Sequence, residues 1–209
     1  MLFGWPGYTL LGQIPMATFL VCYGTGEGQT EKIATRIGST LRDRGHEVTV
    51  ADLGEGSPDQ PLTEFDAVLV GSSIHVGTHQ SAVRTFVGEH RDVLASRPTG
   101  FFQVSLSSAT ADEQRRAEAA KYVDEFVEST GWHPDRIGLF GGALRYSEYG
   151  FLTRLLMKRI AADATGDTDT SQDYEYTDWE EVEAFARDFA AFVEGRLGVA
   201  PPGTDETEP

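Results

Sequence analysis

Residues 17–30 read ATFLVCYGTGEGQT, an apolar run followed by a loop with three glycines and two threonines. The run ATFLVC (17–22) is typical of a buried strand. The next stretch, TEKIATRIGSTLRDRG (30–45), is typical of an amphipathic helix that ends at Gly45. A glycine-rich loop between a strand and a helix N-terminus presents backbone N–H groups to an anion. Residues 17–45 therefore predict a strand, an anion-binding loop and a helix.

The rest of the chain continues the alternation of short apolar runs and amphipathic helical stretches. Several runs are almost continuously apolar, as strands buried on both faces are. Further strands are expected at 46–53, 66–73, 100–106 and 136–144, and further helices at 81–95, 117–130 and 178–195. In the last helix Val182, Phe185, Phe189 and Phe192 share a face, and Gly195 is its expected end. The fold class is α/β: a doubly wound, five-stranded parallel sheet with helices on both faces.

The two ends of the chain differ from this pattern. Residues 1–15, MLFGWPGYTLLGQIP, are apolar but lack the basic start and cleavage site of a secretion signal and are short for a membrane span. We expect them to be an upstream extension outside the fold, with Met16 as the natural start. The domain is expected at 16–197, and residues 198–209 are expected to form a disordered acidic tail.

Charge and cysteine content limit the function classes. The chain has 33 acidic and 17 basic residues, and only three of the basic residues are lysines. This net charge of −16 argues against nucleic acid as a partner and indicates a protein adapted to high salt. Cys22 is the single cysteine and lies in an apolar run, so we expect a packing thiol in a cytoplasmic protein. The five histidines show no metal-ligand spacing, so no metal site is predicted.

The glycine-rich loop distinguishes between nucleotide ligands. A P-loop needs lysine before the threonine, but Gln29 precedes Thr30. A dinucleotide fingerprint needs GxGxxG, whereas this loop reads GxGxG. Hydroxyls and amides without lysine suit a phosphate monoester such as that of FMN, and a glycine-rich turn that only caps the helix is the alternative. The predicted phosphate-binding residues are Thr25, Gly26, Glu27, Gly28, Gln29 and Thr30.

Two later loops follow the third and fourth expected strands, where a flavin ring would need a segment on each side. The candidates are Ser72, Ser73, Ile74, His75, Val76 and Gly77 in the first loop, and Ser105, Leu106 and Ser107 in the second. The sequence GSSIH (71–75) is no nucleophile elbow, because histidine stands where GxSxG requires glycine. His75 either lies against the flavin or substrate or is solvated.

Sequence motifs beyond the loops are more specific. They are FVGEH (86–90), WHPDRIGLFGGALRYSEYG (132–150), LMKRI (156–160), GDTDT (166–170) and YTDWEEVEAFARDFA (176–190). With these motifs, residues 16–195 resemble the flavodoxin-like protoporphyrinogen IX dehydrogenases, FMN enzymes that pass electrons to menaquinone. The resemblance implies strand order 2-1-3-4-5, one bound FMN, and oxidation of protoporphyrinogen IX to protoporphyrin IX in three two-electron rounds, with a quinone as acceptor.

A helical insert is expected after the fifth strand, at 145–165, where apolar residues stand beside Arg154, Lys158 and Arg159. This composition suits a substrate with propionates, or contact of residues 150–160 with an anionic membrane surface. The substrate candidates are Arg145, Tyr146 and Lys158. Arg145 follows the fifth strand and can bind a carboxylate bidentately. The alternative is a helix that packs on its own sheet with solvated basic residues.

Three other functions remain open at this point. An FMN electron carrier would fit the acidic charge but has no need of the insert. A flavodoxin-like NAD(P)H:quinone reductase would be bleached by NADPH. A binding module that does not use FMN for redox chemistry would be the non-enzymatic option. The sequence makes no prediction of oligomeric state.

Overall fold

The computed structural model describes residues 16–75, 77–109, 113–145, 157–158, 162 and 169–199. Its centre is a parallel sheet with the strand order β2-β1-β3-β5-β6. The strands are β1 (Thr18–Gly24), β2 (Glu47–Asp52), β3 (Ala67–His75), β5 (Thr99–Ser105) and β6 (Arg136–Gly141). This is the expected order 2-1-3-4-5, counted over the five parallel strands.

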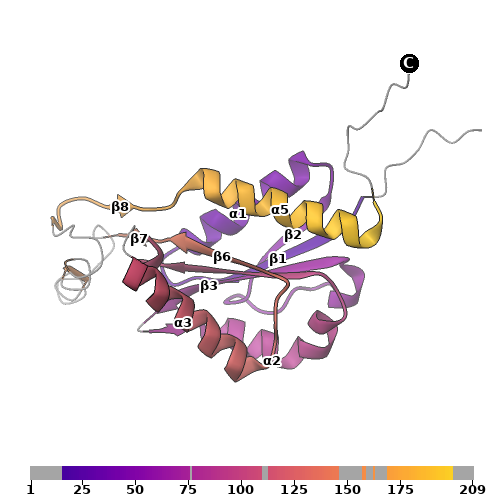
Figure 1. Ribbon diagram of the computed structural model, residues 1–209, viewed down its shortest axis with the longest axis horizontal. Coiled ribbons are helices and arrows are strands. Elements are labelled where there is room, and N and C mark those ends of the chain that lie inside the picture. The colour runs from indigo at the N-terminus through magenta and orange to yellow at the C-terminus, as the bar shows by residue number, and fades with distance from the viewer. Residues whose placement is uncertain are drawn as a thin grey trace, which may run out of the picture.

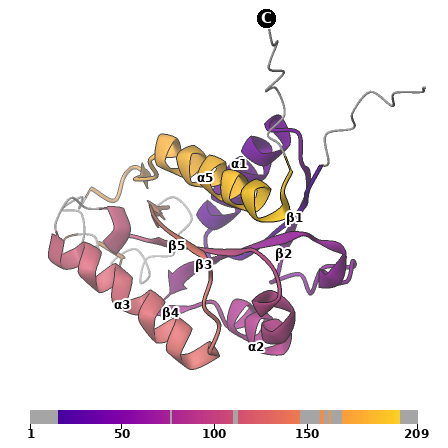
Figure 2. The ribbon, with the colours of Figure 1, turned by 45° about the vertical axis from the view of Figure 1, so that its right-hand side comes forward.

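Helices cover both faces of the sheet. In both ribbon views, α1 (Gln29–Asp43) and α5 (Trp179–Leu197) lie on one face, and α2 (Ser81–Ala95) and α3 (Glu113–Thr130) lie on the other (Figures 1 and 2). Short 3-10 turns occur at Leu62–Glu64 and Ser107–Ala109. The doubly wound architecture predicted from the alternating pattern is confirmed.

The central strands are buried on both faces, and β1 shows how. Phe19 and Val21 belong to the core under α1 and α5, whereas Leu20 and Cys22 belong to the core on the α2 side. Cys22 is fully buried, and its Sγ donates to the carbonyl of Leu69 at 3.5 Å. Burial raises the pKa of the Cys22 thiol, which confirms the predicted packing thiol.

The third and fifth strands differ from their predicted form. β3 extends to His75 and turns back into β4 (Thr78–His79), which pairs antiparallel with it. The expected strand 136–144 divides at Gly142. Gly142 follows the end of β6, and its amide donates to the carbonyl oxygen of Ser105 at the end of β5, while its own carbonyl accepts from Tyr176 N. The remainder forms β7 (Ala143–Leu144), which pairs antiparallel with β8 (Tyr174–Glu175) in a sheet of its own.

The last helix ends later than predicted. α5 passes through Gly195 and reaches Leu197, and Gly198 takes the left-handed conformation with φ 69°. The expectation that Gly195 ends the helix is therefore wrong. A glycine ends a helix where it adopts the left-handed conformation after the last turn. In α5 that glycine is Gly198 and not Gly195. At the other end, the Asp178 side chain accepts from the amides of Glu180 and Glu181 and caps the helix.

Several predictions fall outside the described residues. These are the extension 1–15, most of the insert 145–165, and residues 200–209 of the expected tail. Of the insert, Arg145, Met157, Lys158 and Ala162 are described. Among the described residues, no helix has the length and apolar character needed to cross a membrane.

Candidate functional site

The loop after β1 is held by a hydrogen bond between two of its own residues. Thr25 Oγ1 accepts a hydrogen bond from Gly28 N at 2.9 Å. Gly28 stands at the N-cap of α1 with φ 80°, a backbone conformation that residues other than glycine rarely adopt. A Cβ at this position would meet no atom within 4 Å. The loop thereby leaves the first amides of α1 at the carboxyl edge of the sheet, where an anion is favoured.

Two polar side chains in the first turn of α1 are buried. Thr30 is 1% exposed, and its Oγ1 has no hydrogen-bond partner among the described residues. Gln29 is 4% exposed and donates from Nε2 to Thr177 Oγ1 at 2.8 Å. Its Oε1 accepts from Nη2 of Arg145 at 3.3 Å. A buried hydroxyl without a partner is costly, and it marks a position where a ligand oxygen would restore a hydrogen bond.

The three predicted loops meet at one edge of the sheet because the parallel strands end in register. Gly24 lies beside Ser72, Ser73 beside Val104, and Ser105 beside Gly141. The sequence-predicted segments 25–30, 72–77 and 105–107 are therefore neighbours. Their meeting was predicted from the sequence, because ligands bind beyond the carboxyl ends of parallel strands.

Gln80 connects the first two loops and was not predicted. Its Nε2 donates to Ser73 Oγ at 2.9 Å. A Cβ on Gly24 would lie 2.9 Å from Gln80 Cβ and 2.7 Å from Val83 Cγ2, so this position requires glycine. Ser72 is fully buried, and its hydroxyl donates to Ser73 O and accepts from the Gln80 amide at the start of α2. The Ser72 hydroxyl therefore joins the loop after β3 to the start of α2.

The remaining predicted loop residues differ in exposure. Ile74 is half-buried, His75 is exposed, Gly77 has φ 76°, and Val76 lies outside the described residues.

In the second loop, Ser105 Oγ lies 2.8 Å from Ser108 Oγ and accepts from Ser108 N. Leu106 packs against the buried Leu144, and Ser107 opens the 3-10 turn. The hydroxyl of Ser105 thus shapes its own loop.

A second histidine in this region is buried, unlike His75. His79 is 5% exposed between the rings of Phe101 and Phe126, and its Nε2 lies 3.0 Å from Gln103 Oε1. Burial lowers the pKa of His79 to about 4, although the bond to Gln103 acts in the opposite direction. His79 is therefore neutral at pH 7 and donates to Gln103, which in turn donates to Ala119 O. Sequence reasoning missed this contact.

A cavity of about 820 Å³ opens beside the phosphate loop. Its walls include the backbone of Gly26 and Gly28, the outer face of α1, Arg145 and Trp179. Lys32 pairs with Glu175 at 3.2 Å. Arg36 pairs with Glu183 at 3.2 Å and lies over the Trp179 ring. The structure therefore places Arg145, predicted as a substrate contact, next to the predicted phosphate loop.

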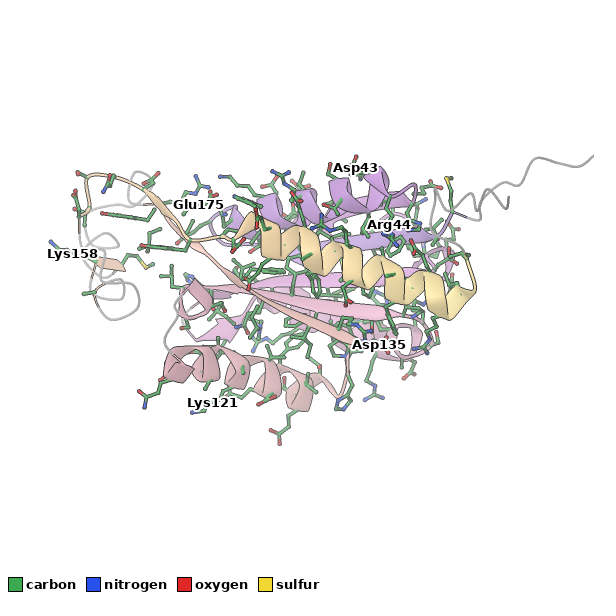
Figure 3. All side chains as sticks on the ribbon, turned by 45° about the horizontal axis from the view of Figure 1, so that its top comes forward. Asp43, Arg44, Lys121, Asp135, Lys158 and Glu175 are labelled. Atoms are coloured by element: carbon green, nitrogen blue, oxygen red, sulfur yellow. The ribbon has the colours of Figure 1, made fainter. Side chains whose placement is uncertain are left out.

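The structure places one of the other two substrate candidates. Lys158 is exposed and does not line this cavity, and Tyr146 lies outside the described residues. Figure 3 shows Lys158 at one end of the molecule, beyond Glu175 and well separated from Arg44. Within the described ranges, no three His, Cys, Asp or Glu side chains are placed to hold a metal ion.

A parallel sheet in the order β2-β1-β3-β5-β6, with a glycine and hydroxyl loop after its first strand, defines a flavodoxin-like protein. The flavodoxin domain family matches residues 20–171. A short-chain flavodoxin associated with a bacterial microcompartment superimposes with a TM-score of 0.52 at 15% identity, over 85% of this chain and 99% of that chain.

Curated relatives narrow the assignment. Protoporphyrinogen IX dehydrogenase [quinone] of Escherichia coli (strain K12) is 37% identical over 82% of this chain and 93% of its own length. The protein of that name from Leishmania major is 34% identical over 82% of this chain and 74% of its own length. The chain belongs to the flavodoxin-like protoporphyrinogen IX dehydrogenase family, which confirms the resemblance read from the motifs.

Proposed function

We propose that this chain is an FMN-dependent oxidoreductase that oxidises protoporphyrinogen IX to protoporphyrin IX with a quinone as acceptor. The observation that carries this proposal is the 37% identity to a protoporphyrinogen IX dehydrogenase over 93% of that protein's length. Six electrons and six protons leave the macrocycle, and three quinones take them up as three quinols. Bound FMN would supply the two-electron redox chemistry that amino-acid side chains lack.

The phosphate loop fits the phosphate of FMN. The first amides of α1, the Gly28 conformation and the unpartnered hydroxyl of Thr30 are features that a phosphate would complete. Thr25 uses its oxygen as an acceptor within the loop, so its hydroxyl proton remains to be donated. Residues 25–30 would hold the phosphate, and residues 72–77 and 105–107 would lie on the two sides of the flavin ring.

An apolar cluster supports a hydrophobic substrate next to this site. The buried Leu144 packs with Leu106, Met157, Tyr174 and Tyr176. The rings of Tyr174 and Tyr176 are nearly parallel, with an interplanar angle of 3° and centroids 6.2 Å apart. Because Leu106 comes from the second flavin-side loop, this cluster adjoins the place proposed for the ring. A largely apolar macrocycle would bury area against such side chains.

The propionates need cationic or hydrogen-bond-donating partners, and Arg145, Tyr146 and Lys158 are the candidates from the sequence. Lys158 is exposed at the end of the molecule that carries β7 and β8 (Figures 1 and 3). We further propose that residues 150–160 contact the inner face of the cell membrane, because a quinone dissolves in the lipid and basic side chains bind anionic headgroups. The protein would then be cytoplasmic and peripheral.

Anaerobic assay of the purified full chain tests the reaction. Protoporphyrinogen IX and a menaquinone analogue are added to the flavin-loaded protein, and porphyrin fluorescence is followed. Quinone-dependent growth of that fluorescence is expected. A yellow protein that ignores the porphyrinogen but takes electrons from a reductase would be a carrier. Bleaching by NADPH would indicate an NAD(P)H:quinone reductase, and a protein that binds no FMN would contradict all three readings.

Sedimentation with vesicles tests the membrane contact. Binding to vesicles that contain anionic phosphatidylglycerol, and no binding to pure phosphatidylcholine vesicles, is the expected result. Lys158→Glu should weaken it, while Lys121→Glu on α3 is the matched control, because Figure 3 places Lys121 on a different part of the molecule. Equal binding of both variants would contradict contact through residues 150–160.

A further inference from the structure

The phosphate loop lacks a cation of its own. A phosphate monoester carries up to two negative charges, and in P-loops a lysine in the loop balances part of such charge. Here Gln29 occupies that position, and the carboxylates of Glu27 and Glu31 line the same cavity as the loop backbone. Backbone amides and the α1 dipole favour an anion, but nearby carboxylates oppose it. A positive charge from elsewhere in the chain would resolve this conflict.

Arg145 is placed to supply that charge. It lies 116 residues from Gln29 in the sequence, yet its Nη2 is 3.3 Å from Gln29 Oε1. It is half-buried and lines the cavity together with Gly26, Glu27 and Gly28.

Gln29 is itself held in one orientation. Its Nε2 donates to Thr177 Oγ1, and the Thr177 hydroxyl donates to Gly141 O at 2.7 Å. The amide group therefore directs its oxygen toward Arg145. This connection fixes the first turn of α1 relative to the end of β6 and to the segment that follows β8. A glutamine is suited to this because it can donate and accept at once, which lysine cannot do.

We propose that Arg145 contributes the positive charge that binds the phosphate of the flavin cofactor, and that Gln29 is the residue that positions it. This inference rests on the FMN-binding part of the proposed function. The shared chemistry is recognition of an oxyanion, and a substrate propionate is the other source of one. The phosphate is favoured because Arg145 lines the same cavity as the loop backbone at Gly26 and Gly28, whereas Lys158 is exposed and does not line this cavity.

Comparison of FMN with riboflavin isolates the phosphate, since riboflavin is the same flavin without it. The full chain is stripped of flavin and titrated with each ligand, and quenching of flavin fluorescence gives the two dissociation constants. Arg145→Met should raise the constant for FMN about 10- to 100-fold, the usual range for a charge-assisted hydrogen bond. The constant for riboflavin should stay within about twofold. The FMN constant should also lose part of its salt dependence.

A matched arginine on α5 provides the control. Arg187→Met removes a half-exposed guanidinium that pairs with Glu183 and does not line the cavity, and it should change neither constant. Far-UV circular dichroism of each variant establishes that it is folded. Gln29→Leu tests the positioning role. It should raise the FMN constant but not the riboflavin constant, and its effect should be less than additive with Arg145→Met in a double-mutant cycle.

Four outcomes of these titrations and assays would contradict the roles proposed for Arg145, for Gln29 or for the protein. Equal losses for FMN and riboflavin would overturn the inference, because they would show a general structural role. Unchanged FMN affinity with a raised KM for protoporphyrinogen IX would also overturn it, and would assign Arg145 to the propionate. Additive effects of Gln29→Leu and Arg145→Met would overturn the positioning role. A wild type that binds FMN without oxidising porphyrinogen would refute the proposed reaction, and the FMN-to-riboflavin ratio would still decide the inference.

Discussion

The guanidinium of Arg44 donates two hydrogen bonds to the carboxylate of Glu194, at 2.6 and 2.7 Å, and so joins the end of α1 to the last turns of α5. His46 Nε2 lies 3.0 Å from the same carboxylate. Burial alone would raise the pKa of Glu194, but the bonds and charges of Arg44 and His46 outweigh it and lower the pKa below its usual range. This carboxylate therefore remains ionised in the folded protein at neutral pH.

Replacement of Glu194 should destabilise the fold. Glu194→Gln leaves a guanidinium and an imidazole facing a neutral amide at a side chain that is only 4% exposed. The free energy of unfolding should fall by about 3 kcal/mol, measured by urea denaturation. Glu183→Gln is the control, because its partner Arg36 is 49% exposed, and its effect should stay below about 1 kcal/mol. Equal losses in the free energy of unfolding would contradict a larger contribution from the buried pair.

The Thr30 hydroxyl should matter for the cofactor and not for the fold. Thr30→Val keeps the shape of the side chain and removes a buried oxygen that has no partner among the described residues. The flavin-free protein should be as stable as the wild type or slightly more so, while FMN affinity should fall about tenfold. Thermal melts and flavin titration measure the two effects. Thr40→Val at the other end of α1 should leave FMN affinity unchanged.

The buried His79 should make the protein sensitive to mild acid. Its pKa falls from 6.5 to about 4 on folding, so the unfolded chain binds the proton first as the pH is lowered. The stability associated with neutral His79 is complete above pH 6.5 and is lost progressively between pH 6.5 and about 4. The full loss is about 3 kcal/mol.

Urea denaturation between pH 6.5 and 5 measures the His79 effect, because most carboxylates stay ionised there. His79→Gln, which can still bond to Gln103, should flatten the decline of stability over this range. The exposed His133 offers a control, because His133→Gln leaves the contacts of His79 with Phe101 and Phe126 intact and should preserve the decline. A decline that persists in His79→Gln would assign the acid sensitivity to another group.

The two glycines at the end of α5 should respond to alanine in opposite directions. Gly195 lies inside the helix and a Cβ there would meet no atom within 4 Å, so Gly195→Ala should stabilise by about 0.5–1 kcal/mol. Gly198 has φ 69°, and Gly198→Ala should destabilise by about 1 kcal/mol. Differential scanning calorimetry of both variants provides the comparison. Stabilisation by Gly198→Ala would contradict the helix end found in the structure.

The sequence predicted what depends on local pattern. The helices on both faces of the sheet and the buried position of Cys22 follow from apolar runs and helical periodicity. The strand order was implied by the resemblance to the protoporphyrinogen IX dehydrogenase family. The meeting of the three loops follows from the parallel arrangement, because the strands all end at one edge. A source adapted to high salt, inferred from the net charge, stays a prediction.

Contacts between distant side chains could not be predicted from pattern. Gln29 meets Thr177 and Arg145 across 148 and 116 residues, and no periodicity encodes such a pairing. His79 and His75 stand four positions apart in the same loop region, yet one is buried and the other exposed. Their difference arises because β4 folds back on β3 and places His79 against Phe101 and Phe126. The division of the fifth strand at Gly142 depends likewise on a partner strand more than thirty residues away.

The pairing of β7 with β8 also bears on how this domain can change over time. Ala143 lies opposite Glu175 and Leu144 opposite Tyr174, so the chain returns beside the point where it left the main sheet. This two-rung ladder is separate from the sheet of five parallel strands. The length of the connection between Leu144 and Tyr174 can therefore vary in evolution without shifting the register of those parallel strands.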